Sequence, residues 1–222
     1  MTTVGLIGSG RIGSTVAGLA VAAGHPVILS NSRGPDTLKD LADGLGPLAR
    51  AATGEQAAAD GEIVVVTIPL RAYGNVPPGP LAGKVVIDTC NYYPQRDGQI
   101  AEIDSGAATS TELVQRHLAG SAVVKAFNNI FFKHLASLSR PPGAADRSYL
   151  PIAGDDAGAK AAVTAFLDSI GYGAVDAGPL ADSWRQQPGT PVYAAPYGAF
   201  EDERGTPAGA ETIRAALAAA IR

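Results

Sequence analysis

The sequence is poor in cysteine, since Cys90 is the one thiol among its 222 residues. A single cysteine excludes a framework of intramolecular disulfides, and it suits a reducing compartment, so we expect a cytoplasmic location. Charged side chains are also few, at 17% of the chain, and the 17 basic and 21 acidic residues form no block of one sign. The sequence therefore lacks the basic footprint of a protein that binds nucleic acid or a membrane surface.

No apolar run approaches the roughly 20 residues of a membrane span, so we expect no membrane partner. No basic region precedes the apolar segment at residues 4–7, so we also expect no signal peptide. The chain has three histidines, and we predict no metal site.

Hydrophobic residues make up 46% of the chain, and apolar segments alternate with alanine-rich helical ones. Strands are expected at residues 3–7, 26–30, 48–52, 62–68, 84–88, 122–126, 149–153 and 172–176. Helices are expected at residues 11–23, 36–45, 54–60, 157–169 and 206–221. Segments such as Ile63-Val64-Val65-Val66 are apolar without alternation, which is typical of parallel strands buried on both faces.

This alternation predicts an α/β fold of the Rossmann type. We expect a doubly wound, mostly parallel sheet with helices on both faces, the first strand at its centre, and a small C-terminal helical extension. Residues 1–222 should form a single NADP-binding domain, with 178–222 as the extension and 138–148 as a surface loop.

The motif Gly8-Ser9-Gly10-Arg11-Ile12-Gly13 follows the first expected strand and opens a helix, which is the context of a dinucleotide-binding loop. Gly8 permits the tight turn, Gly10 lets the backbone approach a pyrophosphate, and Gly13 lets the helix pack on the strand. The helix N-terminus offers free N–H groups to the phosphates. Ser9, Arg11 and Ile12 should join this contact.

The end of the second strand favours NADP over NAD. An NAD site has an acidic residue there for the ribose 2′-hydroxyl, but this chain has Asn31, Ser32 and Arg33. A hydroxyl and a guanidinium suit a 2′-phosphate. Lys39, in the next helix, is a further candidate for the same phosphate.

In such a sheet, ligands bind beyond the carboxyl ends of the strands. Three more ends therefore matter: Thr67-Ile68-Pro69-Leu70, the segment 88–94 that contains Cys90 and Asn91, and the segment 125–129 that contains Asn128. Pro69 either shapes an apolar wall for a nicotinamide or simply ends the strand.

These ends supply amides and aromatic rings but no evident acid–base pair, so we name no catalytic residue. His134 is the best placed of the histidines, although a packed histidine is the more common case. Lys125 and Cys90 are more typical of structural residues. Hydride transfer between two flat rings needs proximity and orientation rather than an acid–base pair.

Together these residues resemble the NADPH-dependent F420 reductase family (F420:NADP oxidoreductases and their bacterial relatives). The resemblance covers most of the chain and rests on the glycine loop, on Asn31-Ser32-Arg33, on residues 66–69, 88–98 and 124–128, and on the late segment 177–190. It implies NADP(H) bound at the loop and direct hydride exchange with a deazaflavin, coenzyme F420, as possible co-substrate.

By position, the resemblance implies that Ile68, Pro69 and Leu70 face the nicotinamide. It implies that Asn91, Asn128 and Trp184 line a second cleft. The segment Asn129-Ile130-Phe131-Phe132 departs from the family's pattern, so a flavin, a quinone or a small carbonyl compound stays open as the hydride acceptor.

Two alternatives follow from the same residues. One is an NADPH-dependent reductase of a small carbonyl or imine, which would need a proton donor such as His134, Tyr92 or Tyr93. The other is a non-catalytic NADPH-binding module with its nicotinamide face plugged by Phe131, Phe132 or Trp184. A homodimer is the expected oligomer, because two-fold dimers are the commonest.

Overall fold

The computed structural model describes residues 1–222, and its sheet is built from the strands β1 (Val4–Ile7), β2 (Val27–Ser30), β3 (Ala49–Ala51), β4 (Ile63–Val66), β5 (Val85–Asp88), β6 (Ala122–Lys125), β7 (Tyr149–Gly154) and β8 (Gly173–Asp176). Their order is β3-β2-β1-β4-β5-β6-β7-β8. All neighbours run parallel except β6 and β7, which pair antiparallel. The predicted Rossmann-type, mostly parallel sheet is confirmed.

Helices and short 3-10 segments connect these strands. The α-helices are α1 (Arg11–Ala22), α2 (Lys39–Leu45), α3 (Gly54–Asp60), α4 (Pro94–Asp97), α5 (Ala101–Asp104), α6 (Ser110–His117), α7 (Phe132–Ser137), α8 (Ala157–Ser169) and α9 (Ala210–Ala218). The 3-10 segments are η1 (Pro35–Leu38), η2 (Leu70–Asn75), η3 (Gly79–Leu81), η4 (Leu180–Gln186) and η5 (Ala195–Tyr197). None of the helices has the length and hydrophobicity that crossing a lipid bilayer requires.

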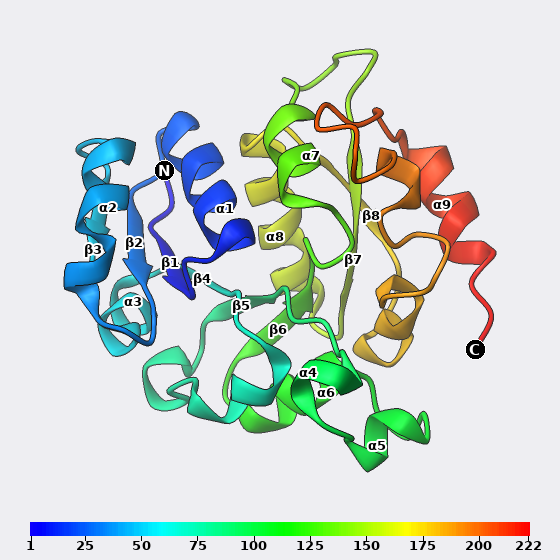
Figure 1. Cartoon of the computed structure of the whole chain (residues 1–222), viewed down its shortest axis with the longest axis horizontal. Coiled ribbons are helices and arrows are strands. Elements are labelled where there is room, and N and C mark those ends of the chain that lie inside the picture. Colours follow the sequence, from blue (N-terminus) through cyan, green and yellow to red (C-terminus); the bar gives the residue numbers. More distant parts are fainter.

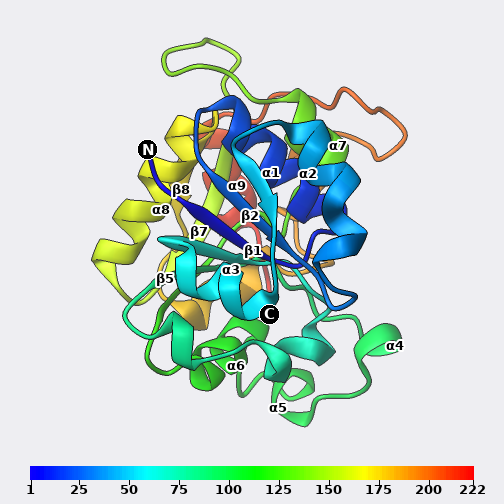
Figure 2. The same cartoon turned by 90° about the vertical axis from the view of Figure 1, so that its left-hand side faces the viewer.

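Side chains of the middle strands alternate between two hydrophobic cores on the two faces of the sheet. In β4, Ile63 and Val65 belong to the larger core, whereas Val64 and Val66 belong to the smaller one. In Figure 2, α1, α2 and α7 lie above the middle strands, and α4, α5 and α6 lie below them. Burial on both faces explains why these strands are continuously apolar in sequence.

The C-terminal residues 178–222 pack on the last two strands. Helix α9 contacts β7 and β8 and adds Ile213 and Leu217 to the larger core. Figure 1 shows α8 and α9 on opposite sides of these two strands. Before α9 the chain returns to the end of β6, where the Ala194 N–H donates a hydrogen bond of 2.8 Å to the Asn129 carbonyl. A segment remote in sequence thereby reaches the strand ends.

Three details differ from the sequence-based expectation. Strand β1 lies inside the sheet between β2 and β4. It is third from one edge rather than central, because β6, β7 and β8 extend the sheet beyond β5. The helix expected at 36–45 begins as η1 and becomes α-helical only at Lys39. The last helix begins at Ala210 rather than at 206, since the segment before it is irregular.

A buried ion pair joins the carboxyl ends of β5 and β6. The Lys125 Nζ lies 3.0 Å from an Asp88 carboxylate oxygen, and the two side chains are only 2% and 0% exposed. The same carboxylate accepts hydrogen bonds from the Thr111 hydroxyl of α6, at 2.7 Å, and from the Cys90 N–H, at 2.8 Å. Lys125 also donates to the Cys90 carbonyl. The pair thus fixes the loop that leaves β5.

We expect Lys125→Met to lower the free energy of unfolding by about 3–5 kcal/mol, because it leaves the Asp88 carboxylate buried without its cation. Urea unfolding followed by circular dichroism measures the loss. The control is Arg50→Met, which removes an ion pair with Asp60 whose side chains are 51% and 53% exposed and which should change stability little. Equal effects of the two substitutions would contradict the structural role of the buried pair.

Candidate functional site

Two cavities meet at the carboxyl ends of the parallel strands. The first, of about 630 Å³, lies over the ends of β1 and β2. The second, of about 360 Å³, lies beyond the ends of β4, β5 and β6. Gly10, Thr67, Ile68 and Pro69 line both cavities and form the wall between them. One elongated ligand can therefore occupy the first cavity and reach into the second.

Each residue predicted to bind the cofactor lines at least one cavity. Apart from the shared wall, Gly8, Ser9, Asn31, Ser32 and Arg33 line the first cavity, and Arg11, Ile12 and Asn91 line the second. Asn128, predicted to bind the substrate, also lines the second cavity.

The three loop glycines occupy positions where a side chain would have different consequences. Gly8 has a φ of +104°, and a Cβ there would lie 2.3 Å from the Thr67 carbonyl oxygen. A Cβ on Gly13 would lie 2.3 Å from the Gly8 carbonyl oxygen, so this glycine permits the close packing of α1 on the loop. A Cβ on Gly10 would meet nothing within 4 Å. Gly10 thus keeps open the space in front of the α1 N-terminus, where a phosphate can approach the backbone.

The loop after β2 presents Arg33 to the first cavity. The Arg33 N–H donates to the Asn31 side-chain oxygen at 2.9 Å, and the Asn31 amide donates to the Thr37 hydroxyl at 2.9 Å. These bonds shape the turn, while the exposed Arg33 guanidinium has no ion-pair partner. A cation held at a cavity rim without a counter-charge is available to an anionic ligand.

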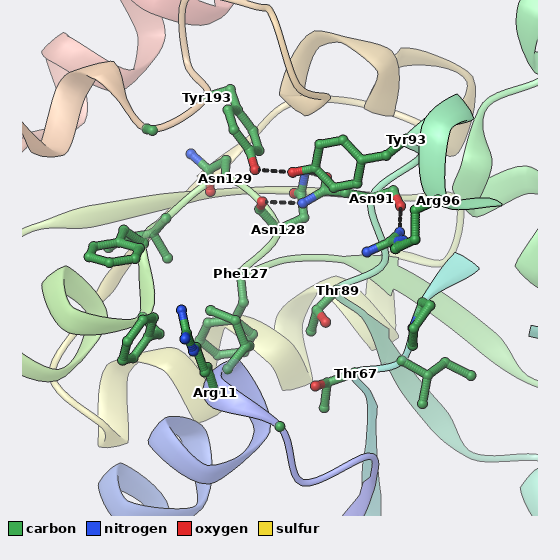
Figure 3. Close-up of a pocket in the computed structure, with 18 of the residues that line it drawn as sticks. Arg11, Thr67, Thr89, Asn91, Tyr93, Arg96, Phe127, Asn128, Asn129 and Tyr193 are labelled. Atoms are coloured by element: carbon green, nitrogen blue, oxygen red, sulfur yellow. Dashed lines mark hydrogen bonds between the residues drawn. The ribbon is translucent and has the colours of Figure 1, made fainter. Parts of the chain in front are cut away.

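Amide side chains from the ends of β5 and β6 form one side of the second cavity (Figure 3). The Asn91 amide donates to the Asn128 carbonyl at 2.8 Å. In return, the Asn128 amide donates to the Asn91 side-chain oxygen at 3.0 Å and to the Gln186 carbonyl at 2.7 Å. These reciprocal bonds hold the loops after β5 and β6 together.

A guanidinium is fixed at the same side of the cavity. Arg96 donates to the Asn91 carbonyl at 2.6 Å and to both oxygens of the Asp97 carboxylate, at 2.9 and 2.8 Å. Burial opposes ionisation of Asp97, but the hydrogen bonds from Arg96 and from the N–H groups of Tyr93 and Arg71 outweigh it and lower its pKa. Asp97 therefore stays anionic and holds Arg96 in place.

Two phenols complete this wall. The hydroxyl oxygens of Tyr93 and Tyr193 lie 2.5 Å apart, although the residues are 100 positions apart in sequence. Figure 3 shows the two rings pointing toward each other above Asn128. Burial, and then the hydrogen bond with Tyr93, raise the pKa of Tyr193. The Tyr193 phenol is therefore protonated at neutral pH.

The opposite side of the second cavity is aromatic. The Phe131 ring lies 4.7 Å from the Phe132 ring and 5.1 Å from the Phe200 ring, centroid to centroid. The Arg11 guanidinium carbon lies 5.2 Å from the centroid of Phe132. Phe131 and Phe132 line the cavity without filling it, so a flat apolar ligand has rings against which it can pack.

Leu70 and Trp184 were expected at the site, but they lie elsewhere. Leu70 is fully buried in the smaller core, because the 3-10 segment that starts at this residue turns its side chain inward. Trp184 lines a separate cavity with Gln187 and Arg222. Its ring is contacted there by the Arg185 and Arg222 guanidiniums, at 4.6 and 5.7 Å.

The remaining candidates for proton transfer are also out of reach. His134 is fully buried and its Nε2 lies 2.5 Å from the Asp202 carbonyl. The Tyr92 phenol donates to Asp104 at 2.7 Å and does not line the second cavity. Burial, and then the nearby Asp88 carboxylate, raise the pKa of Cys90, so the thiol is packed and un-ionised. No cluster of three or more His, Cys, Asp or Glu side chains is placed to hold a metal.

Sequence reasoning did not find Thr89, Phe127, Tyr193, Ala194 or Phe200, all of which line the second cavity. Thr89 and Phe127 lie in the strand-end segments 88–94 and 125–129 that the sequence indicated, although neither was named as a site residue. Tyr193, Ala194 and Phe200 carry no such signal, because the return of the C-terminal segment is a tertiary feature.

Comparison with known proteins gives one family match and several structural matches. The family described as NADP oxidoreductase, coenzyme F420-dependent, matches residues 3–92. Hypothetical protein SMa0349 from Sinorhizobium meliloti is 32% identical over 87% of this chain and 94% of its own, with a TM-score of 0.75. No protein of curated function matches the chain.

More distant structures share the fold. A protein from Arthrobacter sp. FB24, assigned as an F420-dependent NADP reductase, is 24% identical over 82% of this chain and 87% of its own, with a TM-score of 0.70. A reductive aminase from Aspergillus terreus, solved with NADPH, is 17% identical over 82% of this chain and 56% of its own, with a TM-score of 0.58. On the family match and the relative from Sinorhizobium meliloti, the chain belongs to the family of coenzyme F420-dependent NADP oxidoreductases.

Proposed function

We propose that the chain transfers a hydride between NADP(H) and coenzyme F420 or a similar planar acceptor. The observation that carries this proposal is the pair of cavities that share the wall of Gly10, Thr67, Ile68 and Pro69. Two ligands that exchange a hydride must meet face to face. The shared wall is where a dinucleotide in the first cavity would present its nicotinamide to the second.

The first cavity fits the dinucleotide. Gly10 leaves open space in front of the α1 N-terminus for the pyrophosphate, where N–H groups and the helix dipole favour negative charge. Ser32 and the unpaired Arg33 would hold the ribose 2′-phosphate. Ile68 and Pro69, on the shared wall, would support the nicotinamide, which supplies the hydride when the cofactor is bound.

The second cavity fits a flat acceptor with polar groups at one end. Phe131, Phe132 and Phe200 offer aromatic faces on one side, and Asn91 and Arg96 lie on the other. Arg11 and Arg96 line this cavity, whereas no carboxylate does. The cavity therefore favours an acceptor that is neutral or carries negative charge.

A second candidate function is the reduction of a small carbonyl or imine by NADPH. The observation that favours it is the Tyr93–Tyr193 pair, which places phenolic O–H groups inside the second cavity. Such reductions need a proton donor beside the reacting carbon–oxygen or carbon–nitrogen bond. The open cavity beside Phe131 and Phe132 does not favour a non-catalytic module. The cytoplasmic location and the homodimer stay predictions.

We expect the purified protein to reduce oxidised F420 with NADPH, and to do so far more slowly with NADH. Absorbance at the deazaflavin and nicotinamide bands follows both reactants at once. The control reaction replaces F420 with a flavin, a quinone or a small ketone. NADPH binding with transfer to one of these but not to F420 would refute the deazaflavin and keep the oxidoreductase.

We expect Arg33→Ala to reduce the preference for NADPH over NADH by about 10- to 150-fold, because a charge-assisted contact with the 2′-phosphate is worth about 1.5–3 kcal/mol. Fluorescence titration with each cofactor measures the two dissociation constants. NADH binding should be unchanged.

The matched control for Arg33 is Lys39→Ala, which removes an exposed cation from the following helix that does not line the first cavity. It should leave the preference close to that of the unmodified protein. If Arg33→Ala left the discrimination intact, the assignment of Arg33 to the 2′-phosphate would be wrong.

A further inference from the structure

The hydrogen bond between Tyr93 and Tyr193 joins the loop after β5 to the C-terminal segment, and it places two phenols in the second cavity. The sequence led us to expect that orientation alone suffices for transfer between two flat rings, but the reduced acceptor also takes up a proton, and we propose that this pair donates it. The inference rests on the proposed function, since it assumes that NADP(H) binds in the first cavity. The sequence already offered Tyr93 as a candidate proton donor, and the structure adds Tyr193 and the hydrogen bond between the two phenols.

Geometry places both phenols where an acceptor would lie. Tyr93 immediately precedes α4, Tyr193 belongs to the returning C-terminal segment, and both line the second cavity. Their oxygens are 2.5 Å apart. One O–H is used in the bond between them, so the other is left to donate to a ligand, and the structure gives it no protein acceptor.

The surroundings suit a donor that passes through an anionic state. The Arg96 guanidinium carbon lies 4.9 Å from the centroid of the Tyr93 ring, where its charge would stabilise a phenolate. Arg11 and Arg96 are the charged groups that line the cavity, so no carboxylate competes for the proton. Burial and hydrogen bonding raise the pKa of Tyr193, so this phenol carries its proton before the hydride is transferred.

Other groups do not offer the same chemistry at this cavity. His134 is fully buried against the Asp202 carbonyl, and Tyr92 donates outside the cavity to Asp104. Lys125 is buried, bonds to Asp88 and to the Cys90 carbonyl, and does not line the cavity. Because the Arg11 and Arg96 guanidiniums do not give up a proton, the two phenols are the remaining titratable groups that an acceptor in this cavity can reach.

The step balances for a deazaflavin, a carbonyl compound or an imine as the acceptor. The dihydronicotinamide gives a hydride, with two electrons, to a carbon of the acceptor and becomes oxidised. The electron pair of the acceptor's reduced double bond moves to its nitrogen or oxygen, which takes the proton of the nearer phenol. The second phenol returns a proton to the first across the hydrogen bond, and water restores the second.

The test compares Tyr93→Phe, Tyr193→Phe and the double variant with Tyr92→Phe, the neighbouring phenol outside the cavity. We expect the single-turnover rate of acceptor reduction to fall about 10²-fold or more in the first two. The double variant should be no slower than the slower single variant, because the pair acts as a unit. Tyr92→Phe should keep the rate of the unmodified protein.

Two further measurements separate proton donation from positioning. The dissociation constants of NADPH and of the oxidised acceptor in the presence of NADP+, both from fluorescence titration, should stay within about twofold. Added small acids such as imidazolium should raise the rate of the Phe variants and leave the unmodified protein unaffected. Weaker acceptor binding in proportion to the lost rate, with no rescue by acids, would overturn proton donation.

Unmodified rates in both Phe variants would also overturn this inference while leaving the proposed function intact. If instead the unmodified protein bound NADPH but reduced none of F420, flavin, quinone, ketone or imine, the proposed function would fail and this inference with it. Activity of the unmodified protein therefore distinguishes a failure of the proton-donor inference alone from a failure of the proposed function.

Discussion

The site depends on the buried ion pair between Asp88 and Lys125. It joins the carboxyl ends of β5 and β6, and the Asp88 carboxylate also holds Thr111 of α6 and the backbone of Cys90. An ion pair with so little exposure is stabilising only when its remaining hydrogen-bonding groups are satisfied, and here the carboxylate has three donors. The loop that follows Cys90 begins from this fixed point. The pair thus sets where the polar wall of the second cavity starts, although neither charge lines the cavity.

From that fixed point the polar wall is assembled by bonds between loops rather than within them. Asn91 and Asn128 exchange hydrogen bonds across the ends of β5 and β6, and Arg96 ties the Asn91 carbonyl to the Asp97 carboxylate. The wall shared by the two cavities has a different origin, since it comes from the ends of β1 and β4, which are paired in the middle of the sheet. Parallel pairing brings all four ends to one edge, so the fold itself places dinucleotide and acceptor next to each other.

The fold could be predicted because its signals are local. Continuous apolar strands and a glycine loop at the first turn are readable along the chain, and so is the absence of an acid after β2. Leu70 shows where such signals stop. Because Leu70 follows Pro69, the sequence indicated that it lies at the cavity. Whether its side chain points into the cavity depends on the 3-10 segment that begins at Leu70. Tyr193 and Phe200 show the same limit at longer range, because only the packing of the C-terminal segment on β7 and β8 brings them to the strand ends.

Two residues with strained backbone conformations line the second cavity, which indicates that the surrounding structure enforces its shape. Phe127 and Ala194 are the two residues other than glycine with positive φ, both at 62°, and both line this cavity. Each such conformation costs about 1–3 kcal/mol and persists only where the surrounding structure enforces it. Phe127 is fully buried in the larger core, and the Ala194 N–H is held by the Asn129 carbonyl at 2.8 Å. The strained residues directly precede Asn128 and follow Tyr193, so the strain fixes the direction of two cavity-lining side chains. A C-terminal segment that served only to cover β8 would have no reason to carry it.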